Sequence, residues 1–104
     1  MRFVFNASSA VILSRLPEEL QTAIERMQLR IESAVLQHNP GAVASSGFRD
    51  TAYNRSVGGK QYSKHLWGMA RDYLRNSRPH WNPVPGLRMI DEGVESNCVH
   101  FELE

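Results

Sequence analysis

The residues best suited to chemistry in this sequence are two histidines and one aspartate. His65 and Asp72 lie seven positions apart in the polar segment 63–72, and His100 lies near the end of the chain. Two imidazoles and one carboxylate are ligands that zinc prefers, and three protein ligands leave a fourth position for water, as in catalytic zinc sites. The spacing alone is weak evidence, because a His and an Asp seven apart often occur as ordinary polar residues with local partners.

The chain between His65 and Asp72 must fold back if both residues bind one ion. In a continuous helix, seven residues would separate them by roughly 10 Å along the axis, whereas two atoms that each lie about 2 Å from zinc nearly touch. Gly68 is the natural place for this reversal. Beyond it, Ala70 and Asp72 are expected on one face of an extended segment, with Asp72 directed across a sheet toward His100.

A long amphipathic helix from Pro17 to about His38 is predicted as the main scaffold. Its apolar residues recur at spacings of three and four, which is the pattern of a helix with one buried face. This stripe comprises Leu20, Ala23, Ile24, Met27, Ile31, Ala34 and Val35. Pro17 suits the first helical turn, and the Asn-Pro-Gly sequence at 39–41 ends the helix.

The remaining segments before the tail are predicted to be short strands and loops. Residues 2–5 and 42–44 are expected to form short strands, while residues 9–13 fit either a strand or a helical turn. Residues 51–62 and 76–86 are rich in Asn, Gly, Ser and Pro, and we therefore expect long loops there, the second covering the domain.

The tail of the chain has the alternating pattern of a half-buried strand. Val99, Phe101 and Leu103 alternate with His100 and Glu102. One face of this strand is expected to pack against the core. The other face should present His100 and Glu102 together.

Length and composition are typical of one globular domain spanning residues 1–104. Hydrophobic residues make up 41% of the chain and charged residues 22%, which argues against a disordered tail and provides for one hydrophobic core. The net charge of +1 gives no electrostatic reason to expect nucleic acid as a partner. The apolar run at 10–13 is too short for a signal peptide or a membrane span, and the single Cys98 forms no internal disulfide. We expect a monomer made in the cytoplasm and not inserted into a membrane.

Several short motifs follow one another in an order that resembles a known superfamily. They are Ser46-Gly47-Phe48-Arg49, Tyr53-Asn54, Val57-Gly58-Gly59, Ser63-x-His65-x-x-Gly68-x-Ala70-x-Asp72 and Val99-His100. This series resembles that of the zinc D-alanyl-D-alanine carboxypeptidases and dipeptidases, which include phage endolysins that cut L-alanyl-D-glutamate bonds. The resemblance is dense over residues 46–72 and sparse in the tail.

The resemblance implies an α+β fold in which a small antiparallel sheet carries the zinc site and packs against the N-terminal amphipathic helix. His65, Asp72 and His100 would hold the Zn²⁺ ion. Arg49 would bind the substrate or stabilise the oxyanion, a role suited to a guanidinium, although an Arg in this position can also be a structural ion-pair residue. Ser63 and Tyr53 would contact the substrate, although Tyr53 is as well suited to bracing its loop.

The catalytic base is where the sequence departs from the pattern of this superfamily. Many members carry an acidic residue three positions before the last His, and this chain has Asn97 there, which is no useful base at neutral pH. Glu95 is the first candidate, because its approach to His100 resembles that in other branches, including the hedgehog signalling domain. Glu102 is the second, and it is equally suited to orienting an imidazole.

Taken together, these features predict a zinc peptidase that hydrolyses a peptide bond in peptidoglycan stem peptides or cross-bridges. Zinc would polarise the scissile carbonyl and activate water, Glu95 would transfer the proton and Arg49 would stabilise the oxyanion. Two alternatives remain: a non-catalytic zinc-binding structural module of a phage or prophage particle, which Asn97 favours, and a cytoplasmic D,D-dipeptidase. A peptidase without a leader would reach the cell wall after release from the cell or as part of a phage particle.

Overall fold

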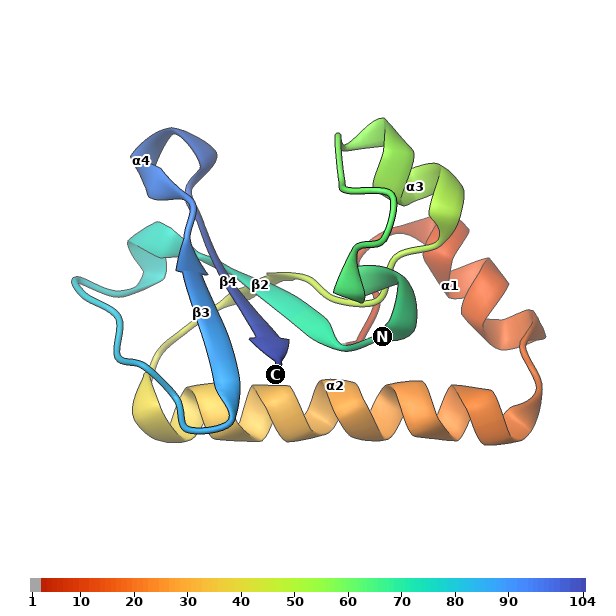
Figure 1. Ribbon diagram of the computed structural model, residues 1–104, viewed down its shortest axis with the longest axis horizontal. Coiled ribbons are helices and arrows are strands. Elements are labelled where there is room, and N and C mark those ends of the chain that lie inside the picture. The colour runs from red at the N-terminus through yellow and green to blue at the C-terminus, as the bar shows by residue number, and fades with distance from the viewer. Residues whose placement is uncertain (1–2) are drawn as a thin grey trace.

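The predicted scaffold helix is present as α2 (Glu18–His38) in the computed structural model, which describes residues 3–104. Pro17 precedes it as the N-cap residue, as expected from the fixed backbone angle of proline. In Figure 1 the sheet lies across one half of α2, and α1 (Ala7–Arg15) and α3 (Thr51–Ser56) lie above the other half. The long helix thus supports both parts of the molecule.

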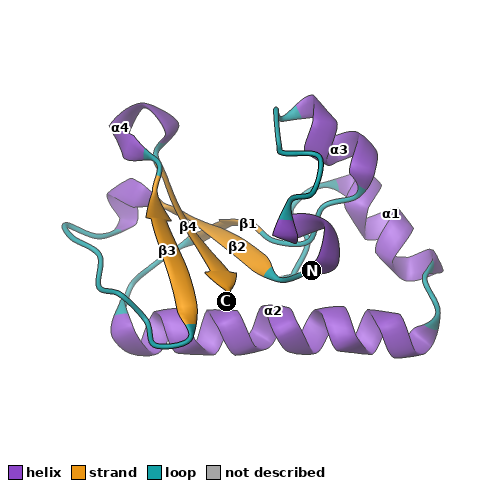
Figure 2. Cartoon of the chain, in the orientation of Figure 1, coloured by secondary structure: helices purple, strands orange, loops and turns teal. Residues whose placement is uncertain are grey.

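Four antiparallel strands form one sheet in the order β1-β2-β4-β3. The strands are β1 (Ala44–Ser46), β2 (Ala70–Leu74), β3 (Leu87–Asp91) and β4 (Cys98–Leu103). β2 and β4 are neighbours in the middle of this sheet (Figure 2), and their register sets Asp72 opposite His100. The predicted α+β class, with a small antiparallel sheet on the amphipathic helix, is confirmed.

The main core lies between the sheet and the C-terminal half of α2. Val99 and Phe101 of β4 are fully buried and belong to one cluster with Tyr73 of β2 and with Ile31 and Val35 of the helix. Each such side chain contributes about 1.5–3 kcal/mol on burial, so this cluster fixes the sheet on the helix. The alternation predicted for the tail is confirmed, and the intervening residues of β4 face away from this core.

The N-terminal segment differs from the expectation of a strand. Residues 9–13, which fitted either a strand or a helical turn, lie within helix α1. Asn6 caps this helix, because its side chain accepts a hydrogen bond from the backbone N–H of Ser9. Of the strand predicted at residues 2–5, residue 2 lies outside the described part of the chain, and residues 3–5 form no strand.

The loop predicted at residues 51–62 is wrong for its first half, which forms helix α3. Asp50 provides the missing signal, because its carboxylate accepts a hydrogen bond of 3.1 Å from the backbone N–H of Tyr53 and so caps the helix. The strand predicted at residues 42–44 is shifted toward the C-terminus, since β1 begins at Ala44.

Two further elements were not expected from the sequence, strand β3 and the short helix α4 (Gly93–Ser96). β3 pairs with β4 along its whole length, although its own residues show no clear alternation. The covering loop at residues 76–86 is confirmed apart from its first two residues, which belong to a 3₁₀ turn, Arg75–Ser77. Among residues 3–104, no helix is both long enough and apolar enough for a membrane span.

Candidate metal centre

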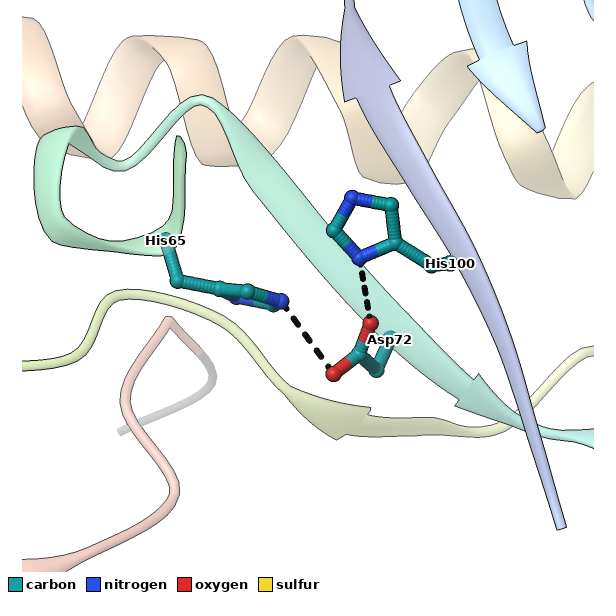
Figure 3. A group of neighbouring side chains, drawn as sticks. All are labelled: His65, Asp72 and His100. Atoms are coloured by element: carbon teal, nitrogen blue, oxygen red, sulfur yellow. Dashed lines mark hydrogen bonds and ion pairs between the residues drawn. The ribbon is translucent and has the colours of Figure 1, made fainter. Parts of the chain in front are cut away.

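The three predicted ligands meet on the face of the sheet that points away from α2. His65 comes from the 3₁₀ turn η1 (Lys64–Trp67), Asp72 from β2 and His100 from β4, and all three are buried. Their ligand atoms lie within 4.8 Å of one another. As Figure 3 shows, the carboxylate of Asp72 stands between the rings, with Oδ2 3.2 Å from His65 Nε2 and Oδ1 2.8 Å from His100 Nδ1.

The predicted reversal of the chain between His65 and Asp72 occurs at Gly68. This glycine ends the 3₁₀ turn with φ 71°, in the left-handed region. A Cβ atom there would lie 2.8 Å from Cγ2 of Ile24 on α2. Ser63 begins the same turn, because its hydroxyl accepts a hydrogen bond from the N–H of His65. Both the backbone angle and the contact with α2 therefore require glycine.

Gly68→Ala is expected to destabilise the protein and to weaken metal binding. The left-handed angle costs an alanine about 1–2 kcal/mol, and the clash with Ile24 adds to that cost or displaces the turn that carries His65. Gly58→Ala is the matched control, because Gly58 has φ 74° but nothing lies within 4 Å of the position that an added methyl group would take. Thermal unfolding and zinc titration of both variants measure the difference. Equal losses in the two variants would contradict a role for the contact with Ile24.

Gln28 of α2 holds the turn and β2 from behind. Its side chain is fully buried, and its Nε2 donates hydrogen bonds to the carbonyl oxygens of Gly68 (2.6 Å) and Ala70 (3.0 Å). Its Oε1 accepts a bond of 3.0 Å from Arg71, which also forms an ion pair with Glu32. Because the segment between two of the ligands is fastened to the helix in this way, the spacing of the ligands is set by the scaffold.

The orientation of His65 is fixed by a backbone carbonyl. Its Nδ1–H donates a bond of 2.8 Å to the carbonyl oxygen of Gly47, which leaves Nε2 directed at Asp72. At Gly47 a Cβ atom would lie 2.4 Å from Oε1 of Gln28 and 2.5 Å from the carbonyl oxygen of Phe3, so only glycine allows this approach. A neutral imidazole whose second nitrogen is bonded in this way is the usual form of a metal-binding histidine. The donor set therefore fits a zinc ion.

The carboxylate of Asp72 and the ring of His100 stabilise each other's charged forms. Burial would raise the pKa of Asp72, but hydrogen bonds from His100 and His65 outweigh it and hold the pKa well below the ordinary 3.8. Burial would lower the pKa of His100, but its bonds to Asp72 and Glu102 outweigh that effect and raise the pKa above 6.5. Without metal, these contacts therefore favour an ionised Asp72 beside a protonated His100 ring.

The metal-free protein is expected to be most stable between about pH 4 and 6.5. The pKa of Asp72 is lowered by folding, so its contribution is present above pH 3.8 and is lost as the pH falls through the folded value. The pKa of His100 is raised, so its contribution is present below pH 6.5 and is lost as the pH rises through the folded value. Zinc requires an unprotonated ring, and its affinity should therefore increase with pH.

Unfolding curves between pH 4 and 9, recorded with a chelator and with zinc, check both parts of this expectation. The chelated protein should lose stability above pH 6.5, while the stabilisation gained from zinc should grow over the same range. A stability of the chelated protein that rises between pH 6.5 and 9 would contradict the assignment of the raised pKa to His100.

Arg49 reaches the same carboxylate from the loop between β1 and α3. Its Nη2 lies 2.9 Å from Oδ2 of Asp72, and its side chain is only 13% exposed. Its other nitrogens donate to Ser46 Oγ (3.1 Å) and to Oδ1 of the buried Asn54 (3.3 Å). Asn54 in turn donates to the carbonyl of Lys60. The guanidinium is therefore held rigidly beside the ligand group.

A cavity of about 420 Å³ opens over the ligand group and gives it access to solvent. The charged and hydroxyl side chains in its lining, besides the three ligands, are Arg49, Lys60, Tyr62, Ser63, Lys64, Arg88, Glu92 and Glu102. Of the residues predicted from the sequence, the structure thus brings Arg49, Ser63 and Glu102 to one cavity with the ligands.

Two predicted site residues lie elsewhere. Glu95, predicted as the base, is exposed on α4 and is absent from the lining of this cavity. Tyr53 also does not line it, and its backbone N–H is engaged by the helix cap at Asp50. Asn97 adopts a left-handed conformation with φ 49°, and its side chain accepts a bond from the backbone of Asn76, so its role is that of a turn residue.

Sequence reasoning missed Arg88 and Glu92 because it missed β3. Once β3 is paired with β4, Arg88 lies opposite Glu102 and Ile90 opposite His100, on the cavity side. Cys98 is partly buried, and burial first, followed by the nearby charges of Asp72 and Glu92, raises the pKa of its thiol. The thiol is therefore held in its protonated form, and the ligand group of His65, Asp72 and His100 does not include it.

The sequence that forms this site resembles one known family of peptidases. The sequence model of the peptidase M15 family matches residues 16–88, whereas no curated protein and no solved structure gave a match. The matched range contains His65, Asp72 and Arg49, while His100 lies beyond it and is brought to the site by the pairing of β2 with β4. Peptidases M15 are zinc-dependent metallopeptidases. With this match over most of its length and a His-Asp-His group at the centre of its sheet, the chain belongs to the peptidase M15 family, within the zinc D-alanyl-D-alanine carboxypeptidase superfamily.

Proposed function

We propose that the protein is a zinc-dependent hydrolase of a peptide bond in peptidoglycan stem peptides or cross-bridges. The observation that carries this proposal is the open ligand group: two histidines and one carboxylate at the floor of a polar cavity, with room for water and a substrate. A zinc ion held there would polarise the scissile carbonyl and lower the pKa of water.

The roles of the surrounding side chains follow from their positions. Arg49, braced by Ser46 and Asn54, directs charge-assisted donors to the edge of the ligand group, where the oxyanion would develop. The hydroxyl of Ser63 lines the cavity beside His65 and is suited to contact the peptide backbone of a substrate. A role for Tyr53 rests on the family resemblance alone.

For the catalytic base we propose Glu92 in place of Glu95. Three acidic residues line the cavity, namely Asp72, Glu92 and Glu102. Asp72 belongs to the ligand group, and Glu102 is engaged by His100 and Lys64. Glu92 is exposed and, within residues 3–104, forms no ion pair, so its carboxylate is available to accept a proton.

The charge of the cavity wall supports an anionic peptide as substrate. Arg88 and Lys60 line the cavity, are exposed and have no ion-pair partner in the described part of the chain. A stem peptide that ends in a free carboxylate supplies the group that such cations bind. We extend the proposal to a monomer that acts at the cell wall, after release from the cell or within a phage particle.

Two alternatives are separated from this function by one pair of assays. Purified protein loaded with zinc is incubated with purified sacculi and with free D-Ala-D-Ala, and released amines are measured. Cleavage of sacculi supports the proposed function, and cleavage of the free dipeptide alone supports a cytoplasmic D,D-dipeptidase. Cleavage of neither, by a protein that binds zinc, would overturn both and favour a structural module of a phage particle.

A further inference from the structure

Glu102 touches His100 at the nitrogen that faces away from Asp72. Its Oε1 lies 2.8 Å from His100 Nε2, whereas Nδ1 of the same ring lies 2.8 Å from Asp72 Oδ1. The ring is therefore clamped between two carboxylates, one at each nitrogen. Of the two, only the Asp72 carboxylate also approaches His65.

We propose that Glu102 is a positioning residue that fixes His100 with its proton on Nε2 and so presents the lone pair of Nδ1 to the metal. An ionised carboxylate only accepts hydrogen bonds, so the nitrogen facing Glu102 must carry the hydrogen. Nδ1 faces the carboxylate of Asp72, which also approaches His65, so a metal held by the ligand group would take the place of the hydrogen on Nδ1. The ring would then be neutral, and its one remaining hydrogen would lie on Nε2 against Glu102. The inference rests on the metal centre of the proposed function and assigns its third ligand atom.

Lys64 holds Glu102 in this position. Its Nζ lies 3.3 Å from Oε2 of Glu102 and also donates to the carbonyl oxygen of Leu103. The side chain of Glu102 is only 14% exposed, so the contact is shielded from solvent more than a surface ion pair. Lys64 directly precedes His65 in the 3₁₀ turn. Glu102, which contacts His100, is therefore held by the neighbour of His65.

The two histidines are oriented by different means and through opposite nitrogens. His65 gives its Nδ1–H to a backbone carbonyl, that of Gly47, and keeps Nε2 for the metal. His100 gives its Nε2–H to a carboxylate and keeps Nδ1. A carboxylate partner makes the opposite ring nitrogen more basic than a carbonyl partner does, and that nitrogen is then a stronger metal ligand. Loss of such a partner typically weakens metal binding 10–100-fold.

The first test is the tautomer of His100 in the zinc-loaded protein, read from two-bond ¹H–¹⁵N correlation spectra of the imidazole rings. The expected result is one metal-bound histidine protonated at Nδ1 (His65) and one protonated at Nε2 (His100), with His100→Ala giving the assignment. A zinc-bound His100 protonated at Nδ1 would overturn the inference while leaving the metal centre in place. This measurement needs no variant of Glu102 and does not depend on peptidase activity.

The second test is zinc affinity, measured by competition with a chelator, in Glu102→Gln and Glu102→Leu. Glutamine keeps an acceptor but loses the charge, so we expect zinc to bind about 10-fold more weakly, and up to about 100-fold more weakly with leucine, which loses both. Glu92→Gln removes a charge from the same cavity without touching His100 and should change affinity by about threefold or less. Equal affinity in wild type and both Glu102 variants would overturn the inference. A wild-type protein that binds no zinc would overturn the metal centre and the inference with it.

Discussion

Replacing His65 by alanine is expected to abolish zinc binding at micromolar metal and to reduce peptidase activity to background. If a closed zinc site is worth about 10–16 kcal/mol in all, each of four ligands accounts for roughly 3–4 kcal/mol, which is a factor of about 10²–10³ in affinity. Within residues 3–104, the ligand group consists of His65, Asp72 and His100. The loss is large because, of these three, only His65 comes from the 3₁₀ turn, so no other member of the group can replace it there. Mass spectrometry of the purified protein measures the metal content.

His80→Ala is the control for this experiment. His80 is exposed in the covering loop and lies outside both the ligand group and the cavity lining, so the variant should bind one zinc ion per chain, as wild type does. Circular dichroism with chelator present shows whether His65→Ala still folds. An equal zinc content in wild type and a folded His65→Ala protein would remove the ligand group from consideration as the metal centre.

The elements that could be predicted from the sequence are those with a long or regular apolar pattern. Helix α2 and strand β4 carry complete periodic stripes, and both form where they were expected. Helix α3 has six residues and depends on one capping bond from Asp50, and β3 has five residues whose burial follows no alternation. Such short elements are stabilised by neighbours that are distant in the sequence, and local patterns do not reveal them.

The same division applies to the site. The identities of the ligands and the reversal at Gly68 follow from local motifs, and the structure brings those residues together. The residues that brace the ligands do not form a motif: Gln28 is separated from Gly68 by forty positions, and Lys64 from Glu102 by thirty-eight. One signal was present, because Gln28 is a polar residue within the buried stripe of α2, between Ile24 and Ile31.

The sequence and the structure favour different residues as the catalytic base, Glu95 and Glu92 respectively. Glu95 and Glu92 are three positions apart, but α4 lies between β3 and β4 and leaves Glu95 exposed outside the cavity, whereas Glu92 lines it. A base must come within hydrogen-bond reach of the water that it deprotonates. Because the short helix begins after Glu92, the carboxylate that directly precedes it is the one that remains on the cavity wall.

Glu92→Gln is therefore expected to keep its zinc and to lose turnover by about 10²–10⁴-fold, the usual contribution of a positioned base. Glutamine has nearly the same size and keeps a hydrogen-bond acceptor, but its amide takes no proton from water at neutral pH. The loss should fall on kcat more than on KM, since the substituted group acts in the transition state. Steady-state kinetics on a soluble stem peptide, with zinc content measured on the same samples, provide the test.

Glu95→Gln is the matched control, because it makes the same chemical change three positions away on an exposed surface. It should retain nearly full kcat and zinc content. The reverse result, with Glu95→Gln inactive and Glu92→Gln active, would contradict the assignment of Glu92 and return the role of the base to Glu95. If both variants stayed active, neither residue would be the base, and because Glu102 is already committed to His100 and Lys64, the proton would have to leave through solvent or the substrate itself.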